Sequence, residues 1–141
     1  MPERFSGMPF LLFWTMNIEE FRNYCLSLPG ACEKMPFGKA ASAYDRGLLV
    51  FEVAGKWFCF FNVDRFDRCN VKCDPDRAAE WQACCDGIGP AYHMNKRHWI
   101  SCSLQGEATD AMLRELVRGS YERVVATLPK RVRETLLFEN V

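Results

Sequence analysis

The chain has 141 residues, 49% hydrophobic and 26% charged, which is the composition of one globular domain and excludes a disordered chain. Its 18 basic and 18 acidic residues give zero net charge, so binding to nucleic acid through bulk charge is excluded and would require a local patch. The eight cysteines form no Cys-x-x-Cys pair and no zinc-ligand spacing, so we expect reduced thiols and no metal site.

The N-terminal segment is apolar but short. Residues 8–16 are far fewer than the roughly 20 that cross a bilayer, and no signal-peptide cleavage site follows them. We therefore expect residues 1–15 to be a dispensable extension, residues 16–130 to form the domain and residues 131–141 to be a C-terminal tail. A cytoplasmic protein without membrane contact is expected.

The first predicted element is a helix that begins after Asn17. Asn17 and Glu20 have the spacing of a capping box, and Pro29-Gly30 ends the helix. An apolar stripe at helical spacing marks its buried face. The stripe consists of Ile18, Phe21, Cys25 and Leu28.

Strands are predicted for the middle of the chain. Residues 48–53 and 56–62 read as a hairpin, with Ala54-Gly55 as its two-residue turn. Residues 57–61 are apolar on both faces, which indicates a central strand covered on both sides. Shorter strands are expected near residues 42–45 and 69–73.

A short helix is expected next, with Asp74 as N-cap and Pro75 in its first position, and it fades at residues 84–85. A loop through residues 87–90 then leads to a strand over residues 98–104. Alternation in this strand places Ile100, Cys102 and Leu104 on one face, and Trp99, Ser101 and Ser103 on the other.

The longest helix follows residues 107–110 and ends at Pro129. Its buried stripe is predicted to be Leu113, Leu116, Val117, Tyr121, Val124 and Leu128. The order of elements predicts an α+β fold in two layers, an antiparallel sheet of about five to six strands packed with about three helices.

Residues 91–100 gather more hydrogen-bonding, basic and aromatic side chains than any other segment. As a nucleic-acid contact, Lys96 and Arg97 would neutralise phosphates, Asn95 could read a base edge and Trp99 could stack on a base. The candidate contact residues are His93, Asn95, Lys96, Arg97, His98 and Trp99. A secondary basic patch is formed by Arg114, Arg118, Arg123, Lys130 and Arg131.

Other interpretations of the 91–100 segment stay open. Its aromatic and amide groups could tie a long loop to the sheet, or it could contact a protein or an anionic ligand. Catalysis is the weakest candidate, because His93 and His98 are five residues apart and no nucleophile is placed beside them. No cofactor is expected.

Several motifs make the chain resemble the MmcQ/YjbR family over residues 16–130. The matching segments are Pro36-Phe37-Gly38, Gly55-Lys56-Trp57-Phe58, residues 71–75, residues 92–99, residues 120–124 and residues 128–130. This resemblance implies a small bacterial cytoplasmic protein, likened to secretion chaperones and to a "double wing" DNA-binding shape. Family members are commonly described as predicted DNA-binding proteins.

Together these observations predict a non-enzymatic binding module. DNA or another nucleic acid is the leading partner hypothesis. The alternative is a protein-interaction adaptor with neither a nucleic-acid nor a catalytic role.

Overall fold

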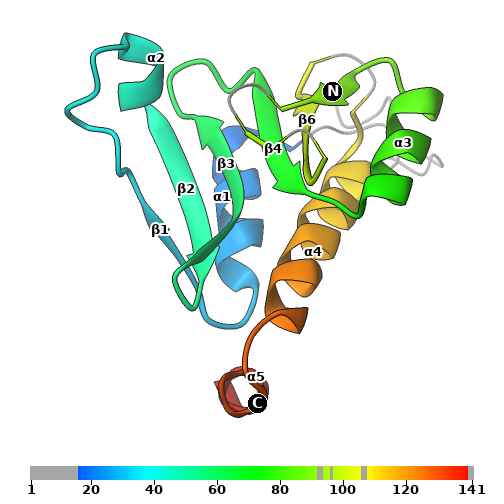
Figure 1. Cartoon of the computed structure of the whole chain (residues 1–141). Helices are drawn as coiled ribbons and strands as arrows, with labels where there is room; N and C mark the ends of the chain where they lie inside the picture. The colour runs from blue at the N-terminus through cyan, green and yellow to red at the C-terminus, as the bar shows by residue number, and fades with distance from the viewer. Residues whose placement is uncertain (1–15, 92–93, 96, 106–107, 140–141) are drawn as a thin grey trace, which may run out of the picture.

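The structure is a computed structural model that describes residues 16–91, 94–95, 97–105 and 108–139. Six antiparallel strands form one sheet in the order β1-β2-β3-β4-β6-β5 (Figure 1). The strands are β1 (Ala31–Lys34), β2 (Leu48–Val53), β3 (Lys56–Asn62), β4 (Arg68–Lys72), β5 (Ile88–Pro90) and β6 (Trp99–Ser103).

Helices cover one face of this sheet and make the second layer. The helices are α1 (Ile18–Ser27), α2 (Ala43–Arg46), α3 (Pro75–Cys84), α4 (Asp110–Ala126) and α5 (Lys130–Glu139). Helices α1 and α4 pack on the same face of the sheet, and α3 flanks β5 (Figure 1). The predicted α+β class is confirmed, with α2 and α5 added to the three helices that the sequence indicated.

The predicted helix caps are present. The Asn17 side chain accepts the N–H of Glu20 at 2.8 Å, and the Glu20 carboxylate accepts the N–H of Asn17 at 2.9 Å. Asp74 caps α3 through the N–H of Asp76, with Pro75 at the first helical position. All six residues of the stripe predicted for the longest helix are buried, although α4 ends at Ala126 and Leu128 lies just beyond it.

Two predictions of strand and loop were wrong. Residues 43–46 form α2 rather than a strand, because the Ser42 side chain accepts the N–H of Asp45 and caps a helical turn. Residues 88–90, expected in a loop, form β5 at the sheet edge, where the N–H that Pro90 lacks is not needed. The first strand of the sheet is β1, which has alternating burial but little apolar character.

Beyond residue 130 the chain forms α5. Its Leu136 is buried in the main core, so part of the segment expected as a tail contributes to packing.

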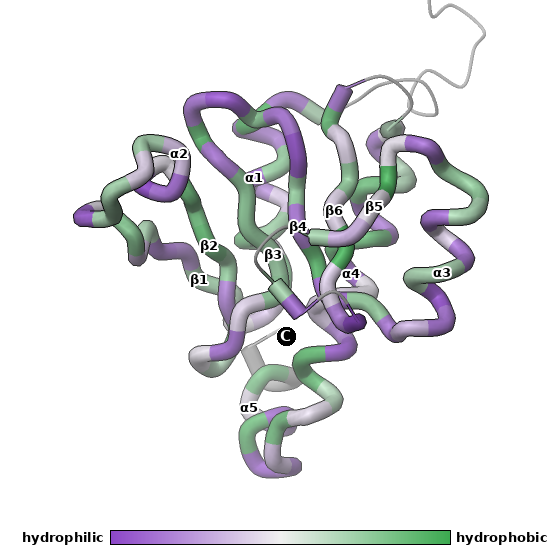
Figure 2. Tube along the Cα trace, turned by 45° about the horizontal axis from the view of Figure 1, so that its top comes forward, coloured by the Kyte–Doolittle hydropathy of each residue, from purple (hydrophilic) through white to green (hydrophobic). Residues whose placement is uncertain are grey.

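Each face of the sheet has its own apolar cluster. The helix-covered face holds the main core, which includes Phe21, Phe51, Phe58, Phe61 and Leu113. The opposite face, which we call the outer face, holds a smaller cluster. Its buried members are Leu48, Val50, Phe60, Ala91 and Trp99. Figure 2 shows that β2 is hydrophobic along most of its length, as expected for a strand with apolar neighbours on both sides.

A β-bulge in β3 explains why two consecutive residues of this strand, Phe58 and Cys59, face the same side of the sheet. Phe51 pairs with Cys59 and Glu52 pairs with Trp57, so that Phe58 is an extra residue. Phe58 and Cys59 consequently both belong to the main core, whereas Trp57 and Phe60 belong to the outer cluster.

Candidate functional site

A cleft of about 930 Å³ lies between α4 and the segment that enters β6. We call it the α4 cleft. Its floor includes the ends of β4 and β6, and α3 contributes one wall. Among its lining residues are Lys72, Asp74, Arg77, Asn95, His98, Trp99, Arg118, Ser120, Glu122 and Arg123.

Three of the six candidate contact residues line this cleft: Asn95, His98 and Trp99. Arg97 is exposed next to them and is not part of the lining. His93 and Lys96 lie outside the described residues, so their predicted roles stay predictions. The structure thus brings half of the predicted set to one concave surface.

Asn95 organises the turn before β6. Its side-chain oxygen accepts the N–H of Arg97 at 3.0 Å, and its main-chain carbonyl accepts the N–H groups of His98 and Trp99 at 3.0 and 2.9 Å. The His98 carbonyl in turn accepts the N–H of Cys73 at 2.8 Å. These bonds support the architectural interpretation, because they tie the segment to itself and to the end of β4.

The side chain of Trp99 is buried and is not exposed to solvent for contact with a ligand. The residue is 5% exposed, and its ring centroid lies 5.5 Å from that of Phe60 in the outer cluster. The alternation predicted for β6 was therefore correct, because Trp99 lies on the face opposite Ile100 and Cys102. That face is also covered, by the apolar residues of the outer cluster. A ring buried in this way does not offer a base the open face that stacking requires.

The residues of the secondary basic patch do not all lie on one surface. Arg118 and Arg123 line the α4 cleft. Arg114 lies elsewhere, because it pairs with Asp110 at 2.6 Å and its guanidinium sits 4.7 Å from the ring centroid of Tyr24. Lys130 and Arg131 begin α5 and do not line the cleft.

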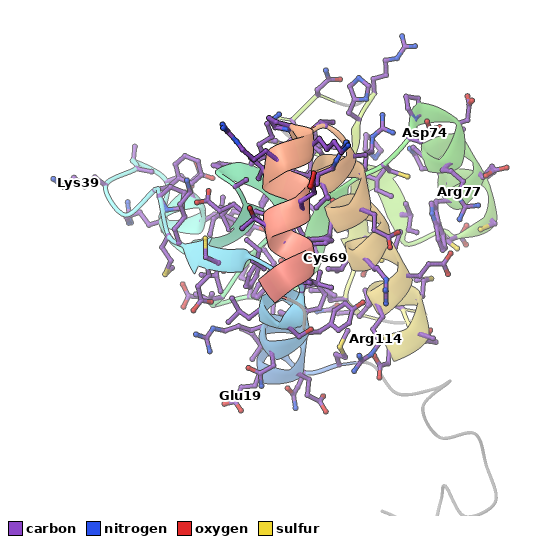
Figure 3. All side chains as sticks on the ribbon, turned by 90° about the horizontal axis from the view of Figure 1, so that it is seen from below. Glu19, Lys39, Cys69, Asp74, Arg77 and Arg114 are labelled. Atoms are coloured by element: carbon purple, nitrogen blue, oxygen red, sulfur yellow. The ribbon has the colours of Figure 1, made fainter. Side chains whose placement is uncertain are left out.

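Carboxylates accompany the arginines of the cleft. Arg123 pairs with Asp74 at 3.6 Å and Arg118 with Glu122 at 3.3 Å. Arg77 of α3 reaches Glu115 of α4 at 3.4 Å, and Figure 3 shows Arg77 near Asp74, the residue that caps α3. The lining therefore has four cations (Lys72, Arg77, Arg118 and Arg123) against three carboxylates, a net charge of +1.

Lys72 differs from these arginines in its partners. Among the residues that the structure describes, no carboxylate pairs with its ammonium group, which lies 5.7 Å from the ring centroid of Trp99. Burial lowers the pKa of Lys72, and the positive charges of Lys56 and Arg123 lower it further. The end of β4 thus carries a partly buried ammonium group that pairs with no carboxylate of the described residues.

The sequence did not single out Lys72 or Arg77 as site residues. Each stands alone in a strand or helix, with no neighbouring cation to make a visible cluster. Alternation along residues 69–73 would have put Lys72 on the face opposite Cys69 and Val71, which is the only signal that could have drawn attention to it.

The described residues contain neither a metal-ligand cluster nor a helix suited to a membrane. No group of three or more His, Cys, Asp or Glu side chains in the described part of the chain is placed to hold a metal ion. No helix there is both long enough and apolar enough to cross a membrane.

Comparison with known proteins relates the chain to one protein family. A family model described as YjbR matches residues 26–123. The uncharacterised protein YbdF of Escherichia coli O157:H7 is 35% identical over 99 residues, which cover 70% of this chain and 81% of YbdF. The uncharacterised protein YjbR of Escherichia coli K12 is 26% identical over 122 residues, covering 86% of this chain and 98% of YjbR.

Solved structures give the same relationship. A crystal structure of a Deinococcus radiodurans protein with the DUF419 domain has a TM-score of 0.75 and 31% identity, over 86% of this chain and 88% of that one. A crystal structure from Pseudomonas syringae has a TM-score of 0.62 and 26% identity, over 77% and 98% of the two chains. With a family model that spans well over half of its length, the chain belongs to the YjbR family.

Proposed function

We propose that this protein is a non-catalytic nucleic-acid-binding module that takes phosphates into the α4 cleft. The observation that carries the proposal is the position of Lys72. Its ammonium group lies in a concave lining beside two arginines of α4, and no described carboxylate neutralises it.

The size of the cleft favours a single strand. At about 930 Å³ it has room for a short run of nucleotides but not for a duplex. Asn95, His98 and the neighbouring Arg97 add hydrogen-bond donors at one rim, so a backbone lying along the cleft would meet donors on both sides.

The ion pairs of the cleft do not prevent phosphate binding. The side chains of Arg118 and Glu122 are 66% and 64% exposed, and surface pairs of this kind contribute about 0–1 kcal/mol. A phosphate can therefore replace a carboxylate at little cost. The zero net charge of the chain implies that such binding is weak and confined to this surface.

The interpretation as a protein adaptor has less support. Such an adaptor is expected to expose a contiguous apolar patch. Of the large hydrophobic residues in the described part of the chain, Met35 and Tyr44 are the exposed ones.

Fluorescence anisotropy with a labelled oligothymidylate and with a duplex of equal length tests the proposal. We expect the single strand to bind at low salt, and affinity to fall with salt at a logarithmic slope of about −1.5 to −2, as neutralisation of two to three phosphates requires. Absence of binding by any oligonucleotide at low salt would show that the proposal is wrong.

A further inference from the structure

A second pocket, of about 800 Å³, lies on the outer face of the sheet, away from α1 and α4. We call it the outer-face pocket. Strands β2, β3, β4 and β6 supply its floor, and the region of α2 and the strand β5 border it. In Figure 2, α2 and β5 lie at opposite ends of this row of strands.

Aromatic rings make up much of the lining. Phe37 meets Trp57 edge-on with ring centroids 5.9 Å apart, and Trp57 meets Phe60 edge-on at 6.0 Å. Leu48, Pro90 and Met94 add aliphatic surface. The volume and the apolar lining are those of small-molecule sites, which combine apolar walls with a few fixed polar groups.

Arg68 is the fixed polar group of this pocket. Its Nε donates to the hydroxyl of Ser101 at 2.7 Å, and one terminal nitrogen reaches the carbonyls of Ser101 and Gly87 at 3.3 and 3.4 Å. The side chain is thus held in one orientation by neutral acceptors. No carboxylate among the described residues pairs with it, although arginine that is partly buried normally has such a partner.

We propose that the outer-face pocket binds a small planar aromatic carboxylate, whose ring lies among Phe37, Trp57 and Phe60 and whose carboxylate pairs with Arg68. Because Ser101 and Gly87 already accept from Nε and one terminal nitrogen of Arg68, the carboxylate would be met by the other terminal nitrogen, in a charge-assisted hydrogen bond that is stronger than one between neutral groups. This proposal does not depend on nucleic-acid binding in the α4 cleft.

The charges of the lining limit the ligand to one negative group. Of the lining residues that the structure describes, Arg68 is the cation and Asp45 is the anion. A second carboxylate on the ligand would therefore find no cation and would be repelled by Asp45. A single phosphate group with two charges is disfavoured for the same reason.

An NMR titration with 2-naphthoate and with its neutral analogue 2-naphthamide tests this assignment. The amides of Gly89 and Ser101 and the side chain of Asn70 report on the pocket, because all three residues line it. We expect 2-naphthoate to bind with a Kd of about 0.1–1 mM. The amide should bind about ten to a hundred times more weakly, since a charge-assisted pair is lost.

Two variants separate the role of the charge from that of the rings. Arg68→Gln should bring the affinities of acid and amide together, whereas Phe37→Ala should weaken both by a similar factor and preserve their ratio. Phe37 is only partly buried, so its replacement is expected to leave the fold intact even if Arg68→Gln does not. Arg118→Gln in the α4 cleft is the control and should change neither affinity.

Any one of four results would overturn the proposal. The first three are equal binding of acid and amide by the unaltered protein, shifts that map to the α4 cleft instead of Gly89, Asn70 and Ser101, and affinities that Phe37→Ala leaves unchanged. Failure of 2-naphthoate to bind at millimolar concentration would also overturn it. None of these results bears on the binding of oligonucleotides.

Discussion

The hydroxyl of Ser120 donates a hydrogen bond to the main-chain carbonyl of Phe58, the extra residue of the β3 bulge. The same hydroxyl accepts the N–H of Lys72 at 2.8 Å. One fully buried side chain of α4 thereby satisfies two backbone groups, one from each of the adjacent strands β3 and β4, just beyond the last pair of their ladder, Cys59 with Val71.

Ser120→Ala is therefore expected to destabilise the protein by about 2–4 kcal/mol. The substitution leaves the Phe58 carbonyl and the Lys72 N–H buried without a partner, and each such group costs about 1–3 kcal/mol. Urea denaturation gives the free energy of unfolding. Ser27→Ala, at an exposed serine whose hydroxyl bonds within its own helix, should stay within about 0.5 kcal/mol of the parent and serves as the control.

Trp99→Ala should lower the free energy of unfolding by about 3–5 kcal/mol, because it empties the centre of the outer cluster. Trp99→Phe keeps a ring against Phe60 and should cost less. Equilibrium denaturation measures both. A loss within about 0.5 kcal/mol for Trp99→Ala would mean that this residue does not tie the segment before β6 to the sheet.

A substitution in the turn between β2 and β3 is expected to stabilise the protein. Ala54 and Gly55 have φ values of 51° and 79°, so both central residues are left-handed, as in a type I′ turn. Ala54→Asn should stabilise the protein by about 0.5–1 kcal/mol, because asparagine tolerates this conformation better than alanine. Gly55→Ala should destabilise it by about 1–2 kcal/mol through backbone strain alone, since an added Cβ would meet no atom within 4 Å. Thermal unfolding of both variants tests the signs.

The buried thiol of Cys59 predicts a loss of stability at alkaline pH. Burial, together with the neighbouring Cys25, raises the pKa of Cys59 well above its ordinary value of 9.0. The unfolded chain loses this proton near pH 9 while the folded chain retains it, so the free energy of unfolding falls as the pH rises through that value. Denaturation series at about pH 8 and pH 10 should show a smaller fall for Cys59→Val than for the parent. An equal fall in both proteins would contradict the prediction.

Lys72→Met should weaken oligonucleotide binding and reduce the salt slope by about 0.7, the contribution of one neutralised phosphate on a single strand. Lys39→Met is the matched control, because Lys39 is exposed on the opposite side of the molecule from Asp74 and Arg77 (Figure 3). Equal effects of the two substitutions would indicate that the α4 cleft has no special part in binding. Anisotropy titrations over a range of salt concentrations distinguish these outcomes.

Elements with local signals could be predicted from the sequence. The Asn17 and Asp74 caps, the 54–55 turn and the apolar stripe of α4 depend on residues close together in the chain, and the structure has all of them. The edge strands were missed for a physical reason. β1 is largely polar because solvent reaches it, and β5 contains residues that disfavour strands except at an edge.

Only part of the candidate site could be predicted from the sequence. The 91–100 segment was predicted as a site because it is rich in hydrogen-bonding, basic and aromatic side chains. Three of its residues, Asn95, His98 and Trp99, do line the α4 cleft. Lys72 and Arg77 reach the same surface from β4 and α3, and only the packing of α4 brings them together. The burial of Trp99 also depends on tertiary structure, because residues of β2 and β3 cover it.

The bulge at Phe58 affects how relatives of this protein should be aligned. If a homologue lacks the residue equivalent to Phe58, regular alternation returns and the pairing of Glu52 with Trp57 is kept, so the residue that corresponds to Trp57 stays on the outer face while the main core loses one aromatic residue. A one-residue gap in β3 should therefore be placed at Phe58, because a gap placed at Trp57 would align an outer-face residue of the homologue with a core residue of this chain.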